Sequence, residues 1–94
     1  MRVVSNRRLM EFSARHPDAH AALQAWRKLM ESTDFGGFAD IKRSFGSVDV
    51  VGGKYAFDIR GNRYRLITGV SFQLQICYIK AVLTQAEYDR GTWK

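Results

Sequence analysis

The 94-residue sequence has few of the residues that form disulfides, metal sites or membrane spans. Cys77 is its only cysteine, which excludes an internal disulfide and any metal motif that needs two cysteines. The two histidines, His16 and His20, flank Pro17, which interrupts a helix at the residue before it. They are therefore not expected to bind a metal from one helical face. We therefore expect no metal site. No apolar run approaches the roughly 18 residues of a membrane span, so we expect no membrane-spanning segment either.

A secretory signal is also missing. The basic residues of segment 1–8 are not followed by the apolar stretch that such signals carry. The sequence shows no internal repeat, low-complexity tract or domain linker, and its length suits one hydrophobic core. We therefore expect a single cytoplasmic domain over residues 1–94, in which Cys77 is a small buried side chain and not a nucleophile.

Basic residues outnumber acidic ones. Fifteen lysines and arginines oppose nine aspartates and glutamates, which gives a formal net charge of +6. Such a surplus favours an acidic partner, with nucleic acid as the first candidate and an acidic protein as the second. A basic surface that serves only solubility is the remaining alternative, so charge alone leaves the function open.

The first third of the sequence predicts two helices. Ser5 and Asn6 are good residues to begin the first helix, which should end at His16 because Pro17 follows. Pro17 suits the first turn of a second helix, whose apolar residues recur with the helical period as far as Met30. Since neither apolar stripe is stable in water, we expect a helical hairpin packed across one face of a sheet.

The remainder predicts that sheet, after a short helix over residues 38–45. Apolar residues recur with a period near two, and the pairs Gly52-Gly53 and Gly61-Asn62 are turn signals. The expected strands cover residues 47–51, 54–59, 63–72 and 76–82. The last is apolar at nearly every position, which favours a central strand covered on both faces. With a closing helical turn after Thr84, the predicted fold is α+β, with the helical hairpin on a small, mainly antiparallel twisted sheet.

The predicted strands carry a cluster of cations. Lys54, Arg63, Arg65 and Lys80 should lie side by side, with Asp58 as the one acid among them. A guanidinium group can hold phosphate through two hydrogen bonds, and lysine adds a point charge. Tyrosine rings can stack on unpaired bases. The cluster therefore predicts a surface for a polyanion, although any one arginine could equally be a solvated surface residue. We expect Arg65 to be exposed, so that reversing its charge would leave the fold intact.

Four segments form a recognisable pattern: Phe57-Asp58-Ile59-Arg60-Gly61-Asn62-Arg63-Tyr64-Arg65-Leu66-Ile67, Cys77-Tyr78-Ile79, Thr84-Gln85-Ala86-Glu87-Tyr88-Asp89 and, in the helical part, His16-Pro17-Asp18-Ala19. These segments resemble the HigB-type toxins of bacterial type II toxin–antitoxin systems. The resemblance covers nearly the whole chain and implies a RelE-like fold. It also implies an mRNA interferase that needs no metal or other cofactor and cuts messenger RNA in the ribosomal A site. Its implied partner is a cognate antitoxin, expected to be a helix-turn-helix protein that provides the only link to operator DNA.

In such an enzyme the RNA 2′-hydroxyl attacks the adjacent phosphate, so the protein must orient RNA, stabilise negative charge and move protons. The resemblance and the cation cluster together define the expected site. Its catalytic residues are Arg63, Arg65, Gln85 and Tyr88, and its RNA-binding residues are Lys54, Arg60, Asn62 and Lys80.

Position 85 departs from the family pattern. The closing motif of the family is expected to read Thr-His-x-Glu-Tyr-Asp, whereas this chain has Gln85. Glutamine cannot exchange a proton near neutral pH, and losing one positioned acid or base typically slows a reaction about 100- to 10,000-fold. Three explanations remain open. Gln85 is an introduced change that disarms a toxin, or it is natural and Tyr88 or a lysine moves the protons. In the third explanation, the histidine that the family pattern leads us to expect mainly binds RNA.

Two rival functions also remain. One is a catalytically silent RNA- or ribosome-binding module, and the other is a protein-interaction domain for an acidic partner.

Overall fold

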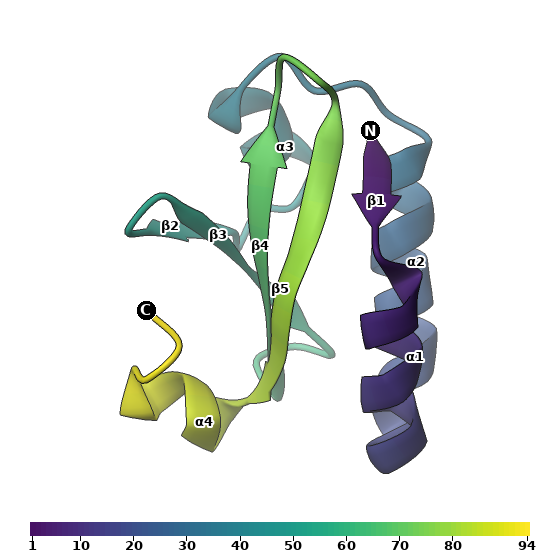
Figure 1. The fold of residues 1–94 in the computed structure, drawn as a ribbon, viewed down its shortest axis with the longest axis vertical. Helices are drawn as coiled ribbons and strands as arrows, with labels where there is room; N and C mark the ends of the chain where they lie inside the picture. The colour runs from purple at the N-terminus through teal and green to yellow at the C-terminus, as the bar shows by residue number, and fades with distance from the viewer.

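Helices from the two ends of the chain lie on opposite sides of a central sheet. In a computed structural model that describes residues 1–94, α1 and α2 lie together on one side of the strands, and α4 lies on the other side with the C-terminus (Figure 1). None of the helices is both long and apolar enough to cross a membrane. The elements in chain order are β1 (Arg2–Val4), α1 (Asn6–Arg15), a 3₁₀ turn (Pro17–Ala19), α2 (His20–Glu31), α3 (Phe38–Ser44), β2 (Asp49–Val51), β3 (Lys54–Ile59), β4 (Tyr64–Ser71), β5 (Ile76–Thr84) and α4 (Gln85–Arg90).

The predicted helical hairpin is present. The first helix ends before His16, as the following proline requires, and Pro17 opens a 3₁₀ turn that leads into α2. Leu9 and Phe12 of α1 and Leu23 of α2 are almost completely buried. Together with residues from the sheet they form the hydrophobic core, so the two apolar stripes are buried against the strands as expected.

The sheet has the strand order β1-β5-β4-β3-β2. Its pairs are antiparallel except for β1, which runs parallel to β5 with Val3 opposite Cys77. Sequence patterning did not predict β1, because a three-residue strand shows too little alternation to be recognised. The Met1 ammonium group donates hydrogen bonds to the carbonyl oxygens of Met30 (3.1 Å) and Thr33 (2.6 Å), and so ties this strand to the end of α2.

One face of β5 is open, which corrects the prediction that this strand is covered on both faces. Cys77 and Ile79 point into the core and are buried, whereas Tyr78 and Lys80 on the other face are exposed. The apolar run of β5 led to a wrong prediction because both long helices, α1 and α2, pack on the same side of the sheet and leave the other side of this strand without a long covering helix. Ile67 pairs with Ala81 and Thr68 with Ile79, so Lys80 is an extra residue that forms a β-bulge at this point. We call the side of β3, β4 and β5 that faces away from α1 and α2 the open face.

Cys77 gives a test of the core. Burial raises the pKa of its thiol to about 11, and the thiolate is the form that reacts with disulfide reagents. At pH 8 the native protein should therefore react about 200-fold more slowly than the urea-unfolded chain, whose thiol has a pKa near 8.5. Absorbance after addition of Ellman's reagent measures both rates, and Cys77→Ala supplies the blank. Equally fast labelling of both states would show that Cys77 is accessible.

Candidate active site

Arg65 is the centre of a polar cluster on the open face. Asp58 of β3 lies directly opposite it in the β3–β4 register, and the two side chains form an ion pair. The Arg65 Nε donates a hydrogen bond to Gln85 Oε1 at 3.0 Å, and its guanidinium carbon lies 4.8 Å from the centre of the Tyr88 ring. Only 15% of the Arg65 side chain is exposed, so the expectation of an exposed arginine was wrong. Contacts on three sides instead fix the orientation of the guanidinium group.

The short helix α4 places Gln85 and Tyr88 on one side, because they are three residues apart. A capping box fixes its start: the Glu87 N–H donates to the Thr84 hydroxyl at 3.2 Å, and the Thr84 N–H donates to the Glu87 carboxylate at 2.9 Å. The Thr84 N–H is also the main reason why the pKa of Glu87 is lowered. The expected cap at Thr84 is therefore present, and it holds Gln85 at the end of β5.

The far end of α4 fixes Tyr88. Gly91 has φ of 73°, a left-handed conformation that glycine adopts easily, and it turns the chain back at the end of the helix. Trp93 then stacks on the Tyr88 ring with 4.9 Å between ring centres, and its indole N–H donates to the Tyr88 carbonyl at 2.8 Å. Since one side of the Tyr88 ring stacks on Trp93 and Arg65 also contacts it, the phenol hydroxyl is the part left free for chemistry.

Arg60 and Arg63 do not join this cluster. Both side chains contact Asp18, Arg60 as an ion pair and Arg63 with 3.5 Å between Nη1 and Oδ2. The Tyr64 hydroxyl donates to the same carboxylate, at 2.8 and 2.9 Å from its two oxygens. Arg63 was expected to share a face with Arg65, but it lies in the turn before β4 and not in the strand. Its backbone still contributes to the site, because the Arg63 carbonyl accepts the Gln85 N–H at 3.2 Å.

The contacts of Asp18 predict how the stability of the fold changes at acidic pH. The Tyr64 hydroxyl, and after it Arg60, lower the pKa of Asp18 below its ordinary value of 3.8. A carboxyl group whose pKa is lower in the folded state stabilises the fold above its unfolded pKa and loses this contribution as pH falls through the folded value. The urea midpoint of Asp18→Asn should therefore fall less than that of the native protein between pH 7 and about pH 3. Asp49→Asn, at an exposed position of β2, is the control, and identical acid sensitivity of the two variants would contradict the prediction.

The other predicted residues are spread along the sheet. Lys80 extends across the open face over Gly69, where an added Cβ would lie 3.1 Å from Lys80 Cε, and its Nζ is 5.7 Å from the centre of the Tyr78 ring. Lys54 begins β3 on the face that also carries Asp58, and Asn62 is exposed in the turn between β3 and β4. The fold thus brings together Arg65, Gln85 and Tyr88, extends this face through Lys54 and Lys80, and places Arg60, Arg63 and Asn62 at the neighbouring turn.

The sequence interpretation missed three contributors. Asp58 was noted only as an acid among cations, although centring the turn on Gly61-Asn62 places residue 58 opposite residue 65. Asp89, which accepts a hydrogen bond from Gln85 Nε2 at 2.8 Å, could have been found from its helical spacing of four. The third is the contact of Trp93 with Tyr88: Trp93 was expected to fold back on the body of the protein, but the sequence offers no signal of the residue that it meets.

No group of three or more histidine, cysteine, aspartate or glutamate side chains lies together in a way that could hold a metal ion. His16 instead stacks on Phe12, with 4.5 Å between the ring centres. The Arg65 cluster offers other means of acting on an anion. The Nε and one Nη of Arg65 have protein partners, which leaves the other Nη to bind a phosphate oxygen. The Gln85 amide and the Tyr88 hydroxyl lie beside it as hydrogen-bonding groups.

Comparisons with known proteins identify the family. A model of the HigB toxin family, described as the RelE-like toxic component of a toxin–antitoxin system, matches residues 19–91. The mRNA interferase toxin HigB of Escherichia coli strain K12 is 28% identical over 92 residues, which cover 95% of this chain and 88% of that protein. Proteins named mRNA interferase HigB from Escherichia coli O157:H7 and Shigella flexneri match to the same extent. The family match covers most of the chain and the fold is of the expected α+β type, so this chain belongs to the HigB family of RelE-like toxins.

Proposed function

We propose that this chain is an mRNA endoribonuclease, the toxin of a type II toxin–antitoxin pair, with residues 1–94 acting as one domain. The relatives named above are mRNA interferases, which supports this reaction. The observation that carries the proposal is the fixed Arg65 guanidinium group, which Asp58, Gln85 and Tyr88 hold at the end of an open sheet face. A site of this kind can bind a phosphate that becomes more negative during reaction.

The proposed reaction needs only RNA, the protein and solvent water. The substrate 2′-hydroxyl gives its proton to water and forms a bond to the adjacent phosphorus. The bond from phosphorus to the 5′-oxygen breaks, that oxygen takes a proton from Tyr88, and a 2′,3′-cyclic phosphate remains on the other RNA fragment. Water then returns a proton to Tyr88. Arg65 stabilises the charge on the phosphate oxygens, and Lys54 and Lys80 bind RNA phosphates along the open face. Tyr88 is the group in the cluster with a proton to donate, whereas Gln85 positions RNA by hydrogen bonds. This reaction is attenuated, because position 85 has no titrating side chain.

Cleavage is proposed to occur on the ribosome in the cytoplasm. Arg60, Arg63 and Asn62 form a second contact area for RNA at the turn before β4. One carboxylate, that of Asp18, neutralises only part of the charge of the two arginines there. A cognate antitoxin, a helix-turn-helix protein, would hold the toxin inactive and would be its only link to operator DNA.

Inducible expression in bacteria tests the function. We expect growth arrest together with cut messenger RNA, and relief of both by the protein encoded beside this chain. Purified protein should cut RNA bound to ribosomes and not the same RNA alone. If neither the native chain nor Gln85→His cut ribosome-bound RNA, the proposal of an endoribonuclease would be wrong.

A catalytically silent RNA-binding module is the second candidate, and the glutamine at position 85 favours it. This module would bind RNA with an affinity that falls steeply with salt, because phosphate contacts release counterions. It would leave RNA uncut even after Gln85→His. Salt-dependent binding measurements combined with gel analysis of the bound RNA distinguish the two candidates. If binding were independent of salt and RNA did not compete with an acidic protein, the chain would be a protein-interaction domain.

A further inference from the structure

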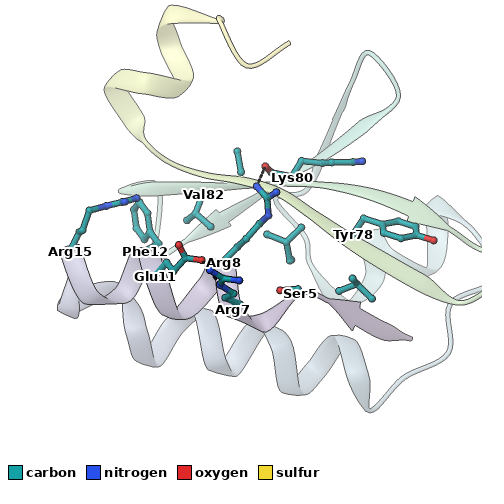
Figure 2. A pocket seen from close by; sticks show the side chains of 12 residues that line it. Ser5, Arg7, Arg8, Glu11, Phe12, Arg15, Tyr78, Lys80 and Val82 are labelled. Atoms are coloured by element: carbon teal, nitrogen blue, oxygen red, sulfur yellow. Dashed lines mark hydrogen bonds and ion pairs between the residues drawn. The ribbon is translucent and has the colours of Figure 1, made fainter.

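A groove lies between α1 and residues Tyr78–Val82 of β5, with a volume of about 790 Å³. Figure 2 shows the Arg7 and Arg15 side chains on the α1 side and Val82 on the β5 side, while the Arg8 side chain reaches across to the Lys80 carbonyl. The candidate active site contributes none of its Arg65, Gln85 and Tyr88 side chains to this groove, although Lys80 borders both. We call it the α1–β5 groove.

The edge of β5 is open within this groove. β1 pairs with β5 only through Ile76, Cys77 and Tyr78, whereas β5 continues to Thr84. Residues 79–84 therefore have β4 as their one neighbouring strand. The Lys80 carbonyl points toward α1, where it accepts a hydrogen bond from Arg8 Nη1 at 3.2 Å (Figure 2). An open strand edge of this kind can pair with an added strand from another chain.

The chemistry of the groove selects among possible strands. Phe12, Ile79 and Val82 supply apolar surface, and the α1 side carries three arginines against one acid, Glu11. Glu11 already forms an ion pair with Arg7, with 3.2 Å between Nε and Oε1. Arg8 and Arg15 have no carboxylate partner in the chain, and Arg15 lies over the Phe12 ring at 5.9 Å. An extended segment that alternates acidic and apolar side chains would satisfy both the arginines and the apolar surface.

We propose that the α1–β5 groove binds an extended acidic segment of the antitoxin, which adds a strand to the open edge of β5. This proposal rests on the proposed function for the existence of an antitoxin. Six residues of β5 are open, so the segment would pair over about 20 Å at roughly 3.3 Å per residue. It would replace Arg8 as the partner of the Lys80 carbonyl and leave the Arg8 side chain to bind a carboxylate. The pairing would run along β5 to Thr84, which caps α4, and so beside the candidate active site.

A direct binding measurement tests the groove without any need for catalysis. The probe is a fluorescent eight-residue peptide that alternates glutamate and valine, and the comparison peptide alternates lysine and valine. We expect anisotropy to detect binding of the acidic peptide only, and hydrogen exchange to slow at residues 79–84. Arg8→Glu and Arg15→Glu should each weaken this binding about tenfold, because each reverses a charge that faces the ligand. Lys28→Glu, the same charge change on the exposed surface of α2, should leave it unchanged.

Three results of this measurement would overturn the proposal. One is equal binding of the acidic and basic peptides. Another is binding of the acidic peptide without protection of residues 79–84. The third is protection of those residues by an eight-residue uridine oligonucleotide but not by the peptide, since the groove would then be an RNA site.

Co-expression distinguishes failure of the groove from failure of the proposed function. Arg8→Glu should still arrest growth, but the protein encoded beside this chain should no longer relieve the arrest. If the neighbouring protein fully relieved the growth arrest caused by Arg8→Glu, the proposal for the α1–β5 groove would be overturned and the proposed toxin function would still hold. Absence of arrest by both the native chain and Gln85→His would overturn the toxin function, and peptide binding would then still decide whether the groove accepts an acidic strand.

Discussion

Replacing Gln85 by histidine is expected to raise the rate of cleavage of ribosome-bound messenger RNA by about 100-fold or more. In the native chain Gln85 bridges two groups: its Oε1 accepts from Arg65 Nε at 3.0 Å and its Nε2 donates to Asp89 at 2.8 Å. A histidine here could keep the hydrogen bond to Asp89 through one ring nitrogen. The other nitrogen would then be held beside Arg65, where it could exchange a proton with the RNA.

Single-turnover cleavage over a range of pH measures this effect. The Gln85→His variant should gain a dependence on pH near the ordinary histidine pKa of about 6.5, and the native chain should show no such dependence. Gln85→Ala is the control, because it removes both hydrogen bonds without adding a titrating group. It should cut no faster than the native chain.

Equal rates for the native chain and Gln85→His would count against a proton-transfer role for this position. In that case the histidine expected from the family pattern mainly binds RNA, or Tyr88 moves protons in this chain. Tyr88→Phe separates these two, because it removes the hydroxyl and keeps the ring between Arg65 and Trp93. A rate unchanged in Tyr88→Phe would exclude the phenol as the proton donor.

The Arg65→Glu variant is expected to lose both cleavage and about 2 kcal/mol of stability. Removing one partner of a buried ion pair leaves the other charge uncompensated, and the cost here is below that of full burial because Arg65 and Asp58 are 15% and 21% exposed. The new glutamate would also face Asp58 directly across the β3–β4 pair, where like charges destabilise a sheet. The prediction that charge reversal leaves the fold untouched therefore needs correction.

Urea unfolding and the cleavage assay measure these two losses separately. Arg65→Lys keeps the charge but loses the planar group that contacts Asp58, Gln85 and Tyr88, so it should lose less than about 1 kcal/mol of stability and most of the cleavage. Adding Asp58→Asn to Arg65→Glu should restore much of the stability and none of the cleavage. If the Arg65→Glu variant had the same urea midpoint of unfolding as the native protein, the pair of Arg65 with Asp58 would contribute no net stability.

Local pattern was enough to predict most elements of this fold. The period-two run of β3, the turn at Gly61-Asn62 and the cap at Thr84 are each formed by residues close together in the chain, whose backbone preferences are encoded locally. The same is true of the break at Pro17. β1 escaped prediction because its three residues become a strand only by pairing with the distant β5.

The sequence by itself determined most of the elements, the excess of positive charge and, through its resemblance to HigB-type toxins, the choice of Arg65, Gln85 and Tyr88. Tertiary structure decided which cations lie together. It turned Arg60 and Arg63 toward Asp18, paired Arg65 with Asp58 and left the edge of β5 open beside α1. The physical reason is that alternation along a strand tells which side chains share a face. Only register, turn geometry and the packing of distant helices decide what each of them meets there.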